Sequence, residues 1–119
     1  MLNVTLKRFD VPDEVRRFPR GRFELIALDG VMIGRATHEP GYKWSVDMAP
    51  SVGTSLCYLK HVGLVLQGRA TTAFEDGRAW ELTRGTLFHI PPEPHDLWVV
   101  GDEPYVTLHF LGDGYYYSK

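Results

Sequence analysis

The stretch "IPPEPHDLWVV", Ile90–Val100, decides how this chain of 119 residues is interpreted. Three prolines stand immediately before His95, and the apolar run Leu97–Val100 follows it. Proline fixes φ and removes a backbone donor, so it suits a bend or the edge of a sheet. The stretch therefore predicts a sharp turn and then a buried strand that begins with a histidine. This histidine is either a structural residue or part of a chemical site.

Composition limits the classes of function. The chain has 13 basic and 15 acidic residues and a net charge of -2, without a basic stripe, which argues against nucleic acid and anionic membranes as partners. No apolar run approaches the ~20 residues of a membrane span, and the first residues lack the apolar segment of a signal peptide. A single cysteine, Cys57, excludes an intrachain disulfide framework. These features predict a cytoplasmic protein.

Turn signals divide the chain into short strands. Asp29-Gly30 and Asp76-Gly77 each separate two β-prone runs, which predicts two hairpins. Turns recur about every eight to twelve residues, as in an all-β sandwich or barrel. Only the segment 9–18, with Asp10 as N-cap, predicts a short helix. We expect one domain over 1–119, with a core at 31–112 and an N-terminal extension with the first hairpin at 1–30.

The second half of the chain resembles the cupins, a family of small barrels. Their second motif has a glycine, five residues, a proline, a turn and a histidine, and Gly85, Pro91 and His95 follow this order with a turn one residue shorter. The end of their first motif matches His61–Gly68, and the Asp76-Gly77 hairpin lies between the two motifs. The resemblance implies an all-β, double-stranded β-helix (jelly-roll barrel) with at most one short N-terminal helix.

The metal-binding pattern of the cupins is incomplete in this sequence. A metal-binding cupin has His-x-His and then Glu in its first motif, but His61 occupies the glutamate position and no histidine stands at 54–57. Two ligand-like residues remain, His61 and His95. The resemblance implies that both point into the barrel, where they would either hold a divalent ion (Zn, Fe, Ni or Mn) or hydrogen-bond to backbone and water.

Strand alternation gives a check on these assignments. His61, Gly63 and Val65 share one face of a strand, and Val62, Leu64 and Leu66 share the other. If the first set lines the barrel, the second set needs a cover, for which we expect a second subunit in a homodimer.

Cys57 is a third candidate metal ligand. It is in phase with His61, but four residues of straight strand would separate the two side chains by ~13 Å. No glycine or proline stands between them, so the expected role of Cys57 is that of a buried structural thiol.

The remaining histidines differ in their expected positions. His89 should face outward because its neighbours are apolar, and His38 should lie in solvent beside a Pro-Gly turn. His109 should lie on the face opposite to Leu108 and Phe110, outside the cavity. A shift of the register by one residue would place it in the cavity, where it would be a candidate third metal ligand.

Two aromatic residues are candidates for binding a small molecule. Tyr42 and Trp44 are expected on a short strand beside a Gly/Pro-rich loop, at the mouth of the barrel. The alternative for both rings is packing in the core or at an interface. The sequence thus predicts a cupin-type barrel that binds a small molecule beside an incomplete divalent-metal site. The alternative is a metal-dependent oxygenase, isomerase or cyclase. No catalytic residue can be assigned from the sequence.

Overall fold

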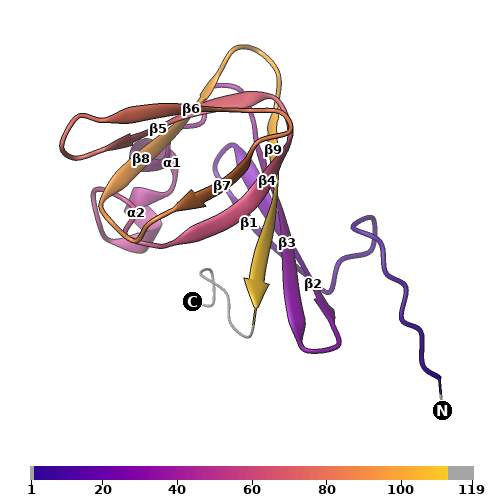
Figure 1. Ribbon diagram of the computed structural model, residues 1–119. Coiled ribbons are helices and arrows are strands. Elements are labelled where there is room, and N and C mark those ends of the chain that lie inside the picture. The colour runs from indigo at the N-terminus through magenta and orange to yellow at the C-terminus, as the bar shows by residue number, and fades with distance from the viewer. Residues whose placement is uncertain (1, 113–119) are drawn as a thin grey trace.

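A computed structural model describes residues 2–112. These residues form strands divided by tight turns, with two short helices between the third and fourth strands (Figure 1). The elements are β1 (Glu14–Phe18), β2 (Gly21–Leu28), β3 (Val31–His38), α1 (Trp44–Asp47), α2 (Ala49–Val52), β4 (His61–Gln67), β5 (Arg69–Phe74), β6 (Ala79–Thr83), β7 (Leu87–Ile90), β8 (His95–Val100) and β9 (Tyr105–Gly112).

The strands form two antiparallel sheets. The larger sheet has the order β1-β2-β3-β9-β4-β7, and the smaller has the order β6-β5-β8. Residues of β3, β4, β7 and β9 of the larger sheet and of all three strands of the smaller one line an internal cavity. Figure 1 shows how these strands are arranged. The all-β jelly-roll architecture predicted from the sequence is confirmed. No helix among residues 2–112 is long and apolar enough to cross a lipid bilayer.

Both predicted hairpins are present. Asp29 and Gly30 have φ angles of 46° and 83°, and β2 pairs with β3 around them. Two consecutive residues with positive φ are typical of the type I′ turn, whose twist matches that of the flanking strands. Gly77, with φ of 94°, lies in the turn between β5 and β6.

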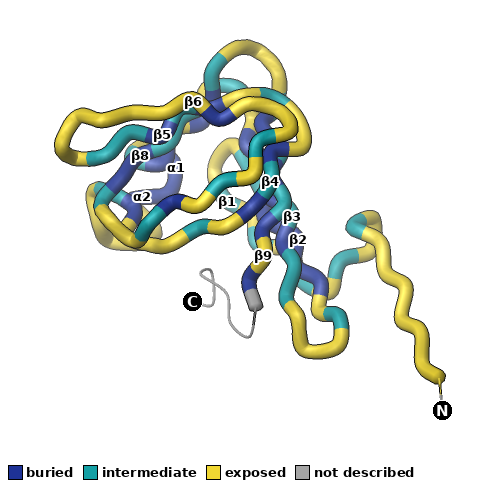
Figure 2. The backbone as a smooth tube through the Cα atoms, in the orientation of Figure 1, coloured by how far each residue is buried: buried dark blue, intermediate teal, exposed yellow. Residues whose placement is uncertain are grey.

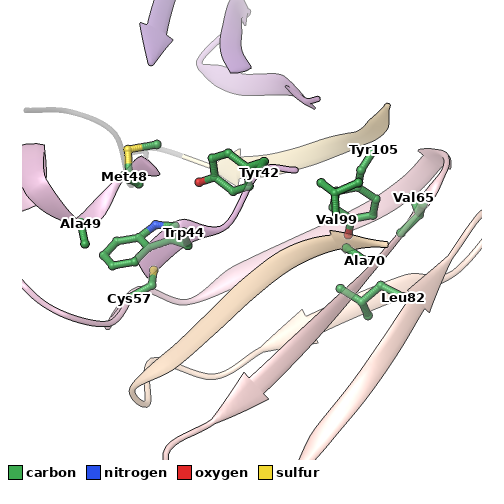
Figure 3. Packing of buried hydrophobic residues seen from close by; sticks show 10 residues of the cluster. All are labelled: Tyr42, Trp44, Met48, Ala49, Cys57, Val65, Ala70, Leu82, Val99 and Tyr105. Atoms are coloured by element: carbon green, nitrogen blue, oxygen red, sulfur yellow. The ribbon is translucent and has the colours of Figure 1, made fainter. Parts of the chain in front are cut away.

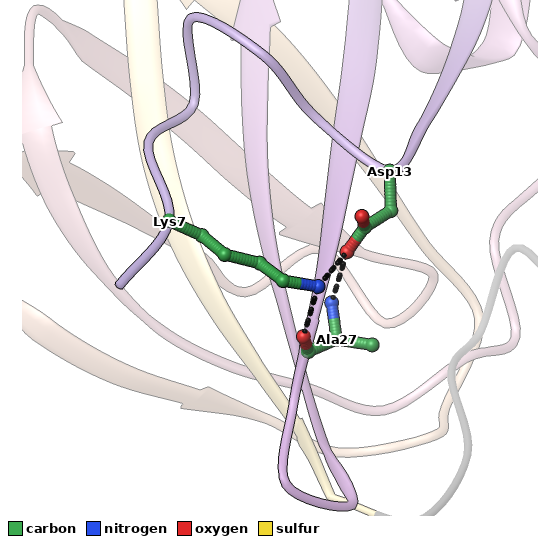
Figure 4. Close-up of polar contacts among 3 residues, drawn as sticks. All are labelled: Lys7, Asp13 and Ala27. Carbon is green, nitrogen blue, oxygen red and sulfur yellow. Dashed lines mark hydrogen bonds and ion pairs between the residues drawn. The ribbon is translucent and has the colours of Figure 1, made fainter. Parts of the chain in front are cut away.

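The predicted N-terminal helix is wrong, because residues 14–18 form β1 and pair with β2. The segment before β1 also lies against β2, where Lys7 Nζ donates to the Ala27 carbonyl at 2.8 Å and to Asp13 Oδ2 at 2.9 Å (Figure 4). The Ala27 amide donates to the same carboxylate at 2.8 Å. These contacts between distant residues outweigh a local helix signal that consisted of one cap and one proline.

The opposite error occurs at the predicted aromatic strand. Trp44 starts α1, and α2 ends at Val52, followed by Gly53 as C-cap with a φ of 91°. Asp96 of β8 accepts hydrogen bonds from the backbone N–H of Ser45 at 3.0 Å and from its hydroxyl at 2.6 Å. A buried carboxylate on the smaller sheet therefore holds this short helix in place, and nothing in the local sequence reveals that contact.

The hydrophobic core lies between the sheets. The segments that contribute to it are drawn in dark blue in Figure 2. Its main cluster joins side chains from both sheets and from the helical segment (Figure 3): Tyr42, Trp44, Met48, Ala49, Cys57, Val65, Ala70, Leu82, Val99 and Tyr105. Gly63 and Val65 of β4 are buried, whereas Val62 and Leu66 are exposed, as the alternation predicted. The division into a core at 31–112 and an extension at 1–30 stays a prediction.

Candidate functional site

A cavity of about 50 Å³ lies inside the barrel. Its lining is rich in histidine, because four of the five histidines of the chain contribute to it. With Cys57, these residues are His38, His61, His95 and His109. No Asp, Glu, Lys or Arg is among the described residues that line it.

His95 is positioned by the proline-rich turn. Its Nδ1 lies 2.8 Å from the carbonyl oxygen of Glu93, and because a carbonyl only accepts, Nδ1 must carry the proton. The lone pair is then on Nε2. The turn answers the question raised by the sequence, since it fixes both the orientation and the tautomer of the imidazole. A hydrogen bond of this kind on the remote nitrogen is the usual support of a metal-ligating histidine.

Cys57 lies directly opposite His95. The two residues form an isolated antiparallel bridge, with the Cys57 N–H donating to the His95 carbonyl at 2.8 Å and the His95 N–H donating to the Cys57 carbonyl at 3.0 Å. This bridge brings the thiol into the cavity from a segment that is outside the named strands.

The expected separation of ~13 Å between Cys57 and His61 is wrong. Cys57 Sγ lies 3.5 Å from His61 Nε2. The estimate assumed a straight strand, but β4 begins only at His61, and residues 58–60 are not in a strand. The bridge to His95 replaces the regular ladder here, so the chain bends without a glycine or proline.

His61 and His95 lie side by side in the cavity. Their ring centroids are 5.4 Å apart, with the planes nearly perpendicular at 84°. One ligand atom each from Cys57, His61 and His95 can be chosen so that all three lie within 4.8 Å of one another. The structure thus brings together the three residues that the sequence selected as candidate metal ligands, including the one for which the spacing was unfavourable.

The predicted position of His109 is wrong, because its side chain is buried and faces inward. Tyr105, Thr107, His109 and Leu111 form the buried face of β9, while Phe110 is 44% exposed. The ring of His109 lies 6.0 Å from that of His61, and its Nε2 is 2.8 Å from the Thr107 hydroxyl. The prediction placed the apolar neighbours of His109 in the core, but the outer face of this sheet is itself partly apolar.

The predicted position of His38 is also wrong. His38 is 7% exposed and lies inside the barrel, where its ring contacts those of Phe18, Tyr42 and Tyr105. The Pro-Gly turn begins only after the residue that follows it, and His38 still pairs with Tyr105 as part of β3. His89, by contrast, is exposed as predicted.

Burial controls the protonation of these groups. Desolvation lowers the pKa of His38 to about 4 and that of His109 to about 3. It also lowers the pKa of His61 and His95. For His61, repulsion from the neighbouring histidines lowers the pKa further. Desolvation raises the pKa of the Cys57 thiol to about 11. At neutral pH the cavity therefore holds neutral imidazoles and a protonated thiol.

Tyr42 and Trp44 both line the cavity and are both buried, so they form part of its wall (Figure 3). The backbone carbonyl of Tyr42 accepts a hydrogen bond from the Val99 N–H at 3.0 Å, which fixes this segment against β8.

A wider groove of about 540 Å³ lies beside the cavity, lined from β5, β6 and β7. Sequence reasoning did not identify it. Four residues line both spaces and so separate them: Thr72, Leu82, Phe88 and Ile90. Trp80, which is 50% exposed, and Phe74 add aromatic surface to the groove.

The comparisons with known proteins agree on the fold. Residues 60–115 match the family model of the AraC-like ligand binding domain. No curated protein matches the sequence. A cupin 2 domain-containing protein from Halorhodospira halophila is 21% identical, with a TM-score of 0.57, over 78% of this chain and 64% of that one.

Two solved enzymes show the same similarity of fold. Ectoine synthase from P. lautus is 12% identical, with a TM-score of 0.66, over 90% of this chain and 77% of that chain. Oxalate decarboxylase from Bacillus subtilis is 20% identical, with a TM-score of 0.60, over 87% of this chain but 28% of the decarboxylase. The chain thus spans less than a third of the decarboxylase and a little under two thirds of the Halorhodospira protein. These similarities and the jelly-roll topology together show that the chain is a small protein of the cupin fold.

Proposed function

We propose that this cupin barrel binds a small molecule in its internal cavity, next to a divalent transition-metal ion held by Cys57, His61 and His95. The observation that carries the proposal is the approach of three ligand atoms to within 4.8 Å of one another inside the barrel.

The chemistry of the three donors fits a metal ion. His95 keeps the Nε2 lone pair free because Nδ1 donates to Glu93. His61 is neutral because burial lowers its pKa, and a neutral imidazole is the form that binds metals. The Cys57 thiol must lose its proton on binding, which a metal ion promotes directly. Nitrogen and sulfur donors favour zinc, iron or nickel over manganese, which prefers oxygen.

The proposed site leaves room for a ligand. Three protein donors are fewer than the four that close a structural zinc site. An ion with an open position polarises a bound oxygen atom or activates water, and the protein residues around it orient the ligand. The metal-dependent enzyme remains the second candidate, and two neighbours of the same fold, ectoine synthase and oxalate decarboxylase, are enzymes.

Elemental analysis tests the proposal. Protein purified without a histidine tag and incubated with zinc, iron or nickel should retain close to one ion per chain after gel filtration. Cys57→Ser, His61→Ala and His95→Ala should each lose most of that ion, because two donors rarely retain a transition ion against buffer. His89→Ala is the matched control, since His89 is exposed. Full retention by all three variants would place the ion elsewhere, and no retention by the wild type would end the metal proposal.

A homodimer and a cytoplasmic location remain part of the proposal. Val62 and Leu66 are 36% and 40% exposed on the outer face of β4, and Phe110 of the neighbouring β9 is 44% exposed. This apolar surface supports a second subunit as its cover. Light scattering at micromolar concentration should give twice the chain mass, and a monomer mass would contradict the dimer.

A further inference from the structure

His38 is a polar group of the cavity that takes no part in the proposed metal site. It is 7% exposed, and its Nδ1 is fully buried without a hydrogen-bond partner among residues 2–112. Burying such a group unpaired costs about 1–3 kcal/mol, so an imidazole in this state indicates a partner from outside the chain. It lines the same cavity as Cys57, His61 and His95, but it does not belong to their group of ligand atoms.

The electrostatics of the cavity limit what this partner is. The described residues that line the cavity include no carboxylate and no permanent cation. A divalent ion bound to one thiolate and neutral imidazoles would leave a charge of +1 in a medium of low dielectric constant. An uncompensated charge is costly there, so a ligand with one negative charge is favoured over a neutral or cationic one.

The volume of the cavity limits the size of the ligand. Its 50 Å³ corresponds to about three to five water molecules, since one water needs ~10–15 Å³ by this measure. A molecule with about six non-hydrogen atoms is therefore near the upper limit, unless it extends into the adjoining groove.

We infer that the cavity takes a small monocarboxylate with a second polar oxygen, whose carboxylate lies beside Cys57, His61 and His95 and whose second oxygen hydrogen-bonds Nδ1 of His38. The inference rests on the proposed metal site for the position of the carboxylate. It adds a ligand class and assigns His38 the role of anchoring the other end of the ligand.

Three probes of almost equal size separate the two parts of this inference. 3-Hydroxypropionate has both groups, propionate lacks the hydroxyl, and 3-hydroxypropanamide lacks the charge. In calorimetric titrations of the zinc-loaded protein, 3-hydroxypropionate should bind at least tenfold more tightly than either of the others. Equal binding of the amide would overturn the assignment of an anionic ligand.

A variant tests the role of His38 itself. His38→Phe keeps an aromatic ring beside Phe18, Tyr42 and Tyr105 but has no ring nitrogen. It should bind 3-hydroxypropionate about tenfold more weakly, the usual loss for one hydrogen bond. Its affinity for propionate and its zinc content should stay unchanged. Unchanged affinity for 3-hydroxypropionate would refute the anchoring role, and loss of zinc would show that His38 supports the metal site instead.

Failure of the inference can be told from failure of the metal proposal. Zinc content is measured before any probe is added, so a wild type without zinc contradicts the metal site first. If His38→Phe does not fold, the imidazole ¹⁵N resonances of the wild type decide. The Nδ1 resonance of His38 should shift with 3-hydroxypropionate but not with propionate, and the same response to both probes would refute the contact.

Discussion

Acidification should destabilise this protein through its buried histidines. His38 and His109 have folded-state pKa values of about 4 and about 3, whereas an unfolded histidine has a pKa near 6.5. The unfolded chain therefore binds more protons than the folded one between pH 6.5 and 4, and stability must fall as the pH falls through this window. Above pH 6.5 both states are neutral at these positions and the effect vanishes.

The magnitude follows from the pKa shifts. A pH of 5 is about 1.5 units below the pKa of an unfolded histidine. The free energy of unfolding therefore falls by about 2 kcal/mol for each histidine that stays neutral in the folded state. His38 and His109 together should therefore remove about 4 kcal/mol between pH 7.5 and pH 5. This loss is comparable to the whole stability of many small domains.

Urea unfolding at several pH values, with a chelator present, measures this effect. His38→Phe should show a shallower dependence than the wild type, with about 2 kcal/mol less loss between pH 7.5 and 5. His89→Phe is the matched control, because it replaces an exposed histidine instead of a buried one. A wild-type stability that does not change with pH, or a slope unaffected by His38→Phe, would refute the reasoning.

Three further changes test individual contacts. Gly63→Ala should lower the free energy of unfolding by about 1–3 kcal/mol, because the added Cβ would lie 2.2 Å from the Leu108 carbonyl oxygen. A melting temperature equal to that of the wild type would contradict this close approach. Asp96→Ala should cost a similar amount in urea unfolding, since it leaves both donors of Ser45 without their acceptor, and Ser45→Ala should cost less. Cys57 is 2% exposed and its thiol pKa is about 11, so it should react with a disulfide reagent at pH 8 only after unfolding; rapid reaction of the native protein would show that the cavity opens.

Local patterns were sufficient for most of the fold. The two Asp-Gly turns and the proline-rich turn before His95 are local signals, and each formed where it was predicted. The helical segment and β1 were wrong because both depend on partners far away in the sequence. Asp96 holds Ser45 across 51 residues, and Asp13 contacts Ala27 across 14.

The candidate site divides in the same way. His61 and His95 followed from motif order, whereas the approach of Cys57 depends on a backbone bridge that no sequence pattern reveals. His38 was assigned to solvent because a Pro-Gly turn was expected directly beside it, whereas His109 was assigned to the wrong face of its strand for another reason. Alternation tells which residues share a face of a strand, but it does not tell which face is inside when both carry apolar side chains, as on β9.

The central position of β9 has a consequence for how the chain folds. β9 lies between β3 and β4 and pairs with both, so the larger sheet consists of two separate parts until residues 105–112 are added. A nascent chain that ends before Tyr105 would expose the edges of β3 and β4, which are templates for incorrect pairing. Closure of the barrel pairs residues that are far apart in the sequence, such as Ile33 and Phe110. Contacts between such distant residues form slowly. We therefore expect folding to be slow, to follow synthesis of β9 and to be most sensitive to aggregation just before that strand is inserted.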